Sequence, residues 1–270
     1  MHDMPAMARY LTAVLQNRPI AEDFYELQFN WPSQAPAPKP GQFLTIRTSQ
    51  SSVPLLRRPF AFSRYDHEDG SARIIYKVRG AATAQLAGKR PFDAVDVLAP
   101  LGKPFPLPDS ETRPILVAGG IGIGPILFLA RALHAHSPAL RLIVGARTAA
   151  GLPSQLSGEY GELIACTDDG SFGHSGTVID ALRSYLSTTT LSTNSGESVL
   201  YLCGPEPMLA GGHRLALECG ITAYVAVEQT MGCAVGACMG CAVRVLGPER
   251  YARACTEGPV FDSRLIDWRE

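Results

Sequence analysis

The sequence predicts an antiparallel β-barrel, then a doubly wound parallel α/β sheet, and finally a cysteine-rich C-terminal extension. Three observations support this class: short β-rich runs up to residue 108, apolar strands alternating with helices after it, and four closely spaced cysteines near the end. The chain has 270 residues, 46% of them hydrophobic, which is enough for more than one core. We therefore expect three regions, at residues 1–108, 109–227 and 228–270.

The first region contains five short runs rich in β-branched and aromatic residues. Clusters of proline and glycine at 32–41 and 103–108 separate them, and strands of this length and spacing are typical of a β-barrel or sandwich. The expected strands are 10–16, 24–29, 42–47, 73–78 and 96–99. The stretch 104–114 contains four prolines and is expected to be a linker.

The second region is expected to be a parallel sheet with crossover connections, because apolar strands alternate with helices from residue 115 onward. The expected strands are 115–118, 140–145, 162–167, 199–203 and 223–227. A helix over 125–134 should follow the first strand, since Pro125 suits a first helical turn. Residues 188–198 are polar and predict a loop.

Two glycine-containing segments follow strands of this sheet. The first contains Gly119, Gly120, Gly122 and Gly124 between a strand and a helix; the second is Cys203-Gly204-Pro205, which follows another strand and opens another helix. Glycines let a backbone approach a pyrophosphate, whose negative charge the N–H groups of a helix N-terminus attract. Tight strand–helix turns also need glycine without any ligand. Because both segments belong to the carboxyl edge of one sheet, together they favour a nucleotide site over packing alone.

A basic segment in the barrel region is a second candidate for phosphate binding. Arg57 and Arg58 precede Pro59, and a guanidinium fits a phosphate through its fixed fork of donors. A solvated basic turn explains these residues equally well. Downstream, residues 74–80 alternate like a barrel strand, and Gly80-Ala-Ala-Thr83 could open a short helix over a second phosphate.

Four cysteines near the C-terminal end have the spacing C-x4-C-x2-C-x13-C; they are Cys233, Cys238, Cys241 and Cys255. This spacing matches a plant-type [2Fe–2S] site, and glycines within the loop let its backbone aim N–H groups at anionic sulfurs. Structural zinc sites usually pair their ligands at both ends, and seven cysteines is an odd number for disulfides. The pattern favours the cluster over zinc. The cysteines at 166, 203 and 219 are expected to be small buried side chains.

The order of these features resembles the ferredoxin-reductase superfamily. Within it, the chain most resembles the electron-transfer subunits of NAD-dependent dihydroorotate dehydrogenase, from about residue 10 to residue 261. The most specific segments are Met231-Gly-Cys-x4-Cys-x2-Cys241 and Cys255-Thr-Glu-Gly-Pro-Val-Phe261.

The resemblance implies FAD in the barrel region and NAD on the sheet. An Arg-Pro-x-Ser motif that holds FAD aligns with Arg58, Pro59, Phe60 and Ala61. The strand that lines the flavin aligns with Ile75, Tyr76 and Lys77, and a Gly-Thr pair at the pyrophosphate aligns with Ala82 and Thr83. Ala61 and Ala82 depart from the motif, and Ser63 is a candidate to replace the missing hydroxyl. Asp168, just after a strand, would hydrogen-bond a ribose and repel a 2′-phosphate, which favours NAD over NADP; Arg147 argues the other way.

The resemblance also implies a relay and a partner. A catalytic subunit with FMN oxidises dihydroorotate, electrons pass singly to the iron–sulfur cluster and then to FAD, and the flavin delivers a hydride to NAD+. No catalytic acid or base is expected in this chain. The implied assembly is a heterotetramer with two copies of each subunit, and the surface around residues 231–241 and Cys255 is the expected docking site.

Composition limits the other classes of function. The net charge of −1 gives no field that favours nucleic acid or an anionic membrane, and no apolar run has transmembrane length. A cytoplasmic protein is expected, since a reducing compartment suits thiolate ligands. No metal-ligand or catalytic pattern in the sequence includes the histidines at 134, 136, 174 and 213, so surface or packing roles are expected for them. Two alternatives stay open: the small subunit of another NAD(P)-linked ferredoxin oxidoreductase or sulfide dehydrogenase, and a zinc-stabilised nucleotide-binding regulatory module.

Overall fold

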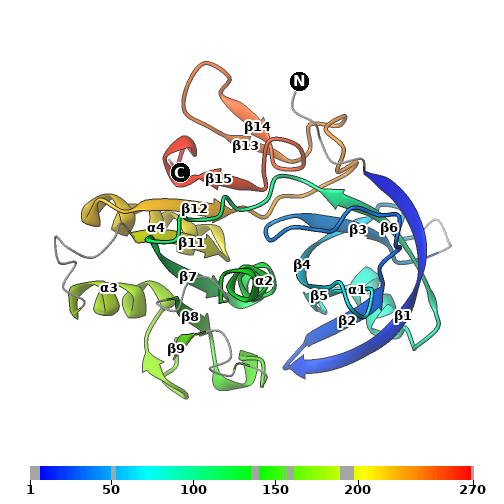
Figure 1. Ribbon diagram of the computed structural model, residues 1–270, viewed down its shortest axis with the longest axis horizontal. Helices are drawn as coiled ribbons and strands as arrows, with labels where there is room; N and C mark the ends of the chain where they lie inside the picture. Colours follow the sequence, from blue (N-terminus) through cyan, green and yellow to red (C-terminus); the bar gives the residue numbers. More distant parts are fainter. Residues whose placement is uncertain are drawn as a thin grey trace.

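The computed structural model describes residues 7–49, 53–134, 140–154, 156, 161–188 and 198–268. Within them, the first six strands close an antiparallel barrel in the order β1-β2-β5-β4-β3-β6, at the right of Figure 1. Their bounds are β1 Ala8–Ala21, β2 Phe24–Asn30, β3 Phe43–Arg47, β4 Arg58–Asp66, β5 Ser71–Lys77 and β6 Ala94–Leu101, with the short helix α1 Ala81–Ala87 between β5 and β6. Apolar side chains such as Leu27, Leu44 and Ile74 fill the barrel.

The barrel differs from the predicted one chiefly at β4. The sequence analysis expected no strand at Arg58 and Pro59 and left phosphate binding and a solvated basic turn open, but both residues lie in β4. Proline is tolerated there because it is the second residue of the strand, and β4 pairs with β5 from Phe62 onward. Strand β1 is also longer than predicted, since it pairs with β6 through its first half and with β2 through its second.

The second region forms a seven-stranded sheet in the described residues, in the order β10-β9-β8-β7-β11-β12-β15. All neighbours are parallel except β12 and β15. The strands are β7 Arg113–Gly119, β8 Arg141–Ala146, β9 Glu162–Thr167, β10 His174–Ser175, β11 Ser198–Cys203, β12 Thr222–Ala226 and β15 Val260–Asp262. The five expected strands are present with ends shifted by at most two residues, whereas β10 and β15 were not predicted.

Helices cover both faces of this sheet, as expected for a doubly wound fold. Helix α2 Ile123–His134 lies between the sheet and the barrel (Figure 1), while α3 Val178–Thr188 and α4 Glu206–Cys219 pack on the other face. The turn η1 Gly120–Gly122 precedes α2, so the helical segment begins before the predicted Pro125. In the predicted loop, residue 188 ends α3 and residue 198 begins β11; 189–197 lie outside the described residues.

The C-terminal region joins the two halves. Strand β15 extends the sheet beside β12. Lys103, two residues after β6, pairs with Pro259, and its N–H donates to the Gly258 carbonyl at 2.6 Å. The hairpin of β13 Ala242–Arg244 and β14 Tyr251–Arg253 projects beyond the sheet, at the top of Figure 1. The short turns η2 Ala149–Gly151 and η4 Ser263–Leu265 complete the named elements. None of the described helices is long and apolar enough to cross a membrane.

Candidate functional site

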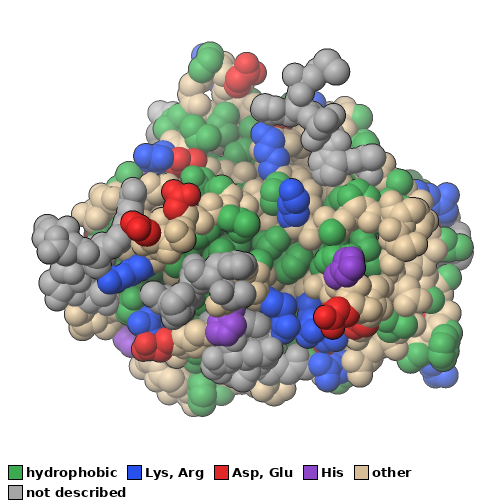
Figure 2. All heavy atoms as spheres, in the orientation of Figure 1, with side chains coloured by type: hydrophobic (Ala, Val, Ile, Leu, Met, Phe, Trp, Pro, Cys, Tyr) green, Lys and Arg blue, Asp and Glu red, His purple; other side chains and the backbone are tan. Residues whose placement is uncertain are grey.

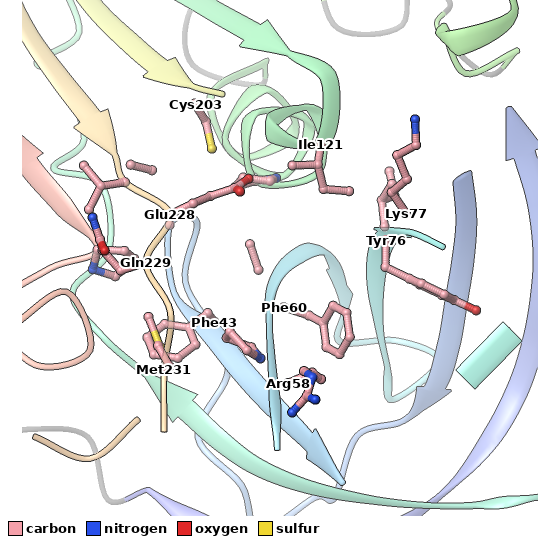
Figure 3. Close-up of a pocket in the computed structure, with 18 of the residues that line it drawn as sticks. Phe43, Arg58, Phe60, Tyr76, Lys77, Ile121, Cys203, Glu228, Gln229 and Met231 are labelled. Carbon is pink, nitrogen blue, oxygen red and sulfur yellow. The ribbon is translucent and has the colours of Figure 1, made fainter. Parts of the chain in front are cut away.

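A cavity of about 280 Å³ lies between the barrel and the sheet. Figure 3 shows barrel side chains such as Phe60 and Tyr76 on one side, and Cys203 at the end of β11 and Glu228 just after β12 on the other. Nine predicted site residues line it: Arg58, Pro59, Phe60, Ala61, Ile75, Tyr76, Lys77, Thr83 and Cys203. Residues that sequence reasoning missed complete the lining: Gly41, Phe43, Arg79, Ile121, Pro125, Ala226, Val227, Glu228, Gln229, Met231 and Pro259.

The barrel wall of the cavity is held rigidly by aromatic packing. The Tyr76 hydroxyl donates to Asn17 Oδ1 at 3.0 Å, and its ring stacks on Tyr25 and meets Phe60 edge-on, with centroid separations of 5.8 and 5.9 Å. Burial raises the pKa of Tyr76 well above its ordinary value, so this phenol stays neutral. The wall therefore offers a fixed, largely apolar surface of the kind that a flat ring system packs against.

Of the residues predicted or considered for phosphate binding at this wall, two line the cavity and two do not. Arg58 lines the cavity and donates to the Leu56 carbonyl at 2.6 Å. Thr83 lines it too, with its Oγ1 accepting from the Arg79 and Gly80 N–H groups at 2.9 and 3.2 Å. Ala82 is 8% exposed, within α1, and is not among the lining residues. Ser63 is buried, beside Gly124, and does not line the cavity in place of Ala61.

The two glycine segments pack against each other at the carboxyl edge of the sheet. A Cβ on Gly122 would lie 2.0 Å from the Cys203 carbonyl oxygen, and Cβ atoms on Gly119 and Gly204 would lie 2.5 and 2.7 Å from Met208 Sδ. Gly122 is therefore required by packing, because its neighbour is backbone, whereas a Cβ at Gly119 or Gly204 would require the flexible Met208 side chain to move. Gly124, in ordinary contact with barrel strands, is required less strictly.

Gly120 is different from its neighbours. Its φ is +54°, and a Cβ there would meet nothing within 4 Å. It exposes backbone at the start of the η1–α2 turn, where the N–H groups of a helix N-terminus attract an anion. Gly204 and Pro205, the residues that precede α4, lie beside this turn, because a Cβ on Gly119 would lie 3.4 Å from Pro205 Cδ.

Asp168 lies outside the cavity, at the same edge of the sheet. It follows β9, and its N–H donates to the Ala146 carbonyl at 3.0 Å, while Asp169 N–H donates to the Arg147 carbonyl at 3.2 Å. Hydrogen bonds from the Ser171 hydroxyl and N–H hold the pKa of Asp169 below its ordinary value. The edge thus presents two carboxylates next to the Arg147 backbone.

Glu228 is the most conspicuous residue that the sequence analysis missed. It follows β12 by two residues, and its side chain extends into the cavity toward Ile121 and Cys203 (Figure 3). Burial raises the pKa of Glu228, an effect that the charge of Arg79 opposes. Its place after the last parallel strand was the available signal, since ligands bind outside the carboxyl ends of such strands. Burial likewise raises the pKa of the Cys203 thiol, which stays neutral.

The four cysteines of the C-terminal region surround a loop rich in inward N–H donors. Cys241 and Cys255 are buried with their sulfurs 3.2 Å apart, whereas Cys238 is exposed. Backbone N–H groups point at the sulfurs: Val235 and Cys238 at Cys233 (3.5 and 3.3 Å), Gly236 at Cys255 (3.2 Å) and Gly240 at Cys238 (3.4 Å).

These donors suit anionic sulfurs. N–H groups of Val235 and Cys238 lower the pKa of Cys233 to about 6, while burial beside Cys241 raises the pKa of Cys255 to about 12. A buried sulfur of that kind becomes a thiolate when iron replaces its proton. In the described residues, no three His, Cys, Asp or Glu side chains are arranged to hold one metal ion. The four cysteines, with backbone N–H groups directed at the sulfurs of three of them, fit the donor set of a [2Fe–2S] cluster.

Known proteins resemble this chain both at the cysteine loop and along nearly its whole length. The family model for the iron-sulfur cluster binding domain of dihydroorotate dehydrogenase B matches residues 228–267. In Geobacillus thermodenitrificans, the electron transfer subunit of dihydroorotate dehydrogenase B (NAD(+)) is 38% identical over 260 residues, which are 94% of this chain and 97% of that protein. This chain belongs to the family of dihydroorotate dehydrogenase B electron transfer subunits. A family member from Desulforamulus reducens is 32% identical over 253 residues, 92% of this chain and 94% of that one.

Solved structures give the same fold for this dihydroorotate dehydrogenase B family member. A chain of the NADH-dependent reduced ferredoxin-NADP oxidoreductase matches with a TM-score of 0.83 and 28% identity, covering 96% of this chain and 90% of that chain. A ferredoxin reductase of carbazole 1,9a-dioxygenase matches with a TM-score of 0.67 and 20% identity, over 81% and 68% of the two chains. The expected ferredoxin-reductase fold is confirmed, and the zinc-stabilised regulatory module is not supported.

Proposed function

We propose that this chain is the electron transfer subunit of an NAD-dependent dihydroorotate dehydrogenase, which moves electrons from a separate catalytic subunit to NAD+. One observation carries the proposal beyond family membership. The end of β12 and the segment after it line the cavity with Ala226, Val227, Glu228, Gln229 and Met231, and Cys233, two residues further on, opens the cysteine loop. Cavity and loop are thus adjacent in one chain, as an electron path between two cofactors requires.

The residues present suit FAD in the cavity and a [2Fe–2S] cluster in the loop. When bound, FAD takes electrons singly and gives two as a hydride, and the cluster carries one electron at a time. Phe60 and Tyr76 supply the flat apolar wall, Arg58 a guanidinium for phosphate, and the Gly80–Thr83 turn the start of α1. Cys233, Cys238, Cys241 and Cys255 would hold the irons, with the loop N–H groups on their sulfurs.

NAD+ would bind at the carboxyl edge of the sheet. The open backbone at Gly120 and the turn before α4 lie side by side as a pyrophosphate site, and Asp168 would hydrogen-bond the ribose. Cys203 and Glu228 lie where the nucleotide edge meets the cavity. Both face the space that a nicotinamide needs next to a flavin.

The partner is proposed to be an FMN-containing catalytic subunit, in a complex with two copies of each chain. Cys238 is exposed, and its neighbour Met239 is 52% exposed, so the cysteine loop presents an apolar surface to such a partner. We also propose a division of the chain at residues 108 and 227, and a cytoplasmic location, where thiolates stay reduced.

Anaerobic purification from the native cells tests the function. We expect a coloured protein with one FAD and two irons and two sulfides per chain, which NADH bleaches, and which co-purifies with a flavoprotein that oxidises dihydroorotate. Co-purification with a different oxidoreductase chain would instead favour an NAD(P)-linked ferredoxin oxidoreductase, a possibility raised by the structural match to such an enzyme. A colourless protein without flavin or iron would contradict both.

A further inference from the structure

The cysteine ligands come from two segments that meet at Cys241, whose carbonyl accepts from the Ala254 N–H at 3.0 Å, and at Gly236. Cys233, Cys238 and Cys241 belong to the first segment, and Cys255 follows β14 in the second. Gly236 of the first segment has a φ of +82°, and a Cβ there would lie 2.9 Å from Thr256 Cγ2. Its N–H donates to Cys255 Sγ at 3.2 Å. Gly236 therefore limits how far apart the two segments lie on the side of the loop away from the β13–β14 pairing.

Arg253 holds Gly236 from the second segment. Its Nη1 donates to the Gly236 carbonyl at 3.0 Å, while its Nε and Nη2 donate to Glu257 at 2.9 and 2.5 Å. Glu257 Oε2 also accepts the Arg253 backbone N–H at 2.7 Å, and its Oε1 accepts from the Thr256 hydroxyl at 3.0 Å. Arg253 and Glu257 thus flank Cys255 in the second segment, and the Glu257 carboxylate fixes the orientation of the guanidinium group. The Nη1 atom of Arg253 is left to reach Gly236 in the first segment.

An ordinary surface ion pair does not have this arrangement. The Arg253 and Glu257 side chains are 37% and 38% exposed, so their mutual attraction contributes little stability by itself. Arg264 and Asp262 form a similar forked pair nearby, but they are two residues apart on one segment. Arg253 is distinguished by its third contact, which crosses between the ligand segments.

We propose that Arg253 and Glu257 form a clamp that joins the two ligand segments and holds Gly236 in place, so that the cluster is retained. Arg253 is a positioning residue: it acts on the cluster through Gly236, whose N–H reaches Cys255 Sγ. The inference rests on the cluster assignment of the proposed function. It assigns a role to the C-terminal Cys-Thr-Glu run beyond supplying one ligand.

Cluster retention in the full-length protein tests the clamp. We would purify wild type, Arg253→Met, Arg253→Lys and Glu257→Gln anaerobically, and follow the decay of cluster absorption in excess ferrous chelator. Loss of a contact that orients metal ligands typically lowers affinity 10- to 100-fold, so we expect cluster loss about tenfold faster in each variant. Arg264→Met is the matched control, with wild-type decay expected. FAD content reports whether each variant has folded.

Three comparisons decide the outcome. Arg253→Lys keeps the positive charge but loses the guanidinium group that contacts Glu257 and Gly236 together. If this variant lost its cluster at the wild-type rate, the charge alone would be sufficient and the clamp would be overturned. The double variant of Arg253→Met and Glu257→Gln should lose its cluster no faster than the worse single variant, because either substitution already breaks the clamp. If the two increases in the rate of cluster loss multiplied, the two residues would act independently, and the clamp would be contradicted. The cluster potential should fall in Arg253→Met, since a weaker N–H bond to sulfur lowers it. If the wild-type protein held no cluster, the proposed function itself would be overturned. That outcome is distinct from failure of the clamp, in which wild type and variants all hold a cluster and lose it at the same rate.

Discussion

Single residues in the cysteine loop have unequal surroundings, and this inequality decides which can be changed safely. Cys241 and Cys255 are each 2% exposed and belong to a core that includes Val243 and Phe261, whereas Cys238 is exposed. Replacing a buried cysteine therefore disturbs packing as well as ligation. Cys238 is the position where ligation alone is removed.

We expect Cys238→Ser to abolish cluster absorption while FAD stays bound and NADH still reduces an artificial two-electron acceptor at a rate within about twofold of wild type. Hydride exchange with the flavin does not pass through iron. Absorption spectra, flavin content and stopped-flow reduction by NADH measure the three properties. Cys219→Ser, at a half-buried position outside the loop, is the control. Loss of NADH oxidation with the fold intact would contradict the separation of the two steps.

Among the structural elements, the turns after β7 and β11 pack against each other at the nucleotide edge. Glycines 119, 122 and 204 let these turns touch, whereas Gly120 faces open space. The sequence analysis treated the glycines as one phosphate-binding group. The structure separates a packing role, strictest at Gly122, from backbone exposure at Gly120.

We expect Gly122→Ala to destabilise the protein by about 3 kcal/mol, because its Cβ would displace the Cys203 backbone from the wall of the cavity. Gly120→Ala has room but requires a left-handed φ of +54°, which costs about 1 kcal/mol. Urea unfolding measures the change in the free energy of unfolding for both variants. Equal destabilisation by the two variants would contradict the division of roles.

The seam between β1 and β6 contains a charged group that stabilises barrel closure. Asp96 is 5% exposed and accepts from Arg9 at 3.0 and 2.9 Å and from Arg57 at 2.6 Å. Burial by itself would raise the pKa of Asp96, but the hydrogen bonds from Arg9 and Arg57 outweigh it and hold the pKa below its ordinary value. Arg57, next to Arg58 of the cavity, is thereby tied to the barrel.

We expect Asp96→Asn to lower the free energy of unfolding by about 2 kcal/mol at pH 7, since it removes a charged acceptor from two guanidinium groups. A depressed folded-state pKa contributes stability above the unfolded value near 4, and that contribution is lost as pH falls through the folded pKa. The gap between wild type and variant should therefore shrink below about pH 4 in urea titrations. Asp66→Asn is the control, because the Asp66 carboxylate, paired with Arg64, is more exposed than that of Asp96. A gap independent of pH would rule out this account.

At the scale of the whole molecule, the cavity exists because barrel, sheet and C-terminal region meet. Figure 2 shows apolar side chains gathered across the middle of one face, where α2 separates the two halves in Figure 1. Pro259, after the last ligand cysteine, lines the cavity and approaches the barrel, since a Cβ on Gly102 would lie 2.5 Å from its Cδ. The cysteine loop is thus anchored at both of its ends to the cavity wall.

We expect Met239→Lys to slow electron transfer from the catalytic subunit about tenfold while leaving the cluster and NADH oxidation intact. A charge on this exposed side chain, beside Cys238, opposes close approach of an apolar partner surface. Dihydroorotate:NAD+ activity of the reconstituted complex measures the effect. Phe92→Lys, on a barrel turn and 88% exposed, is the control. Unchanged transfer in Met239→Lys would place the docking surface elsewhere.

The sequence by itself determined the features that depend on local spacing. These are the alternation of strand and helix after residue 115, the short helix at Gly80–Thr83, and the four cysteines. A period of two or of 3.6 residues, and a ligand spacing, are properties of neighbouring residues in one chain. They led to the family that the comparisons show.

Only the tertiary structure decided which distant residues meet. Arg58 lies in a strand because β3 pairs with it, and β15 joins the sheet across more than thirty intervening residues after β12. Glu228 faces Cys203, and Arg253 reaches Gly236, through contacts that no local pattern encodes. Such contacts depend on how whole elements pack, so the cavity wall and the clamp on the cysteine loop became visible only in the folded chain.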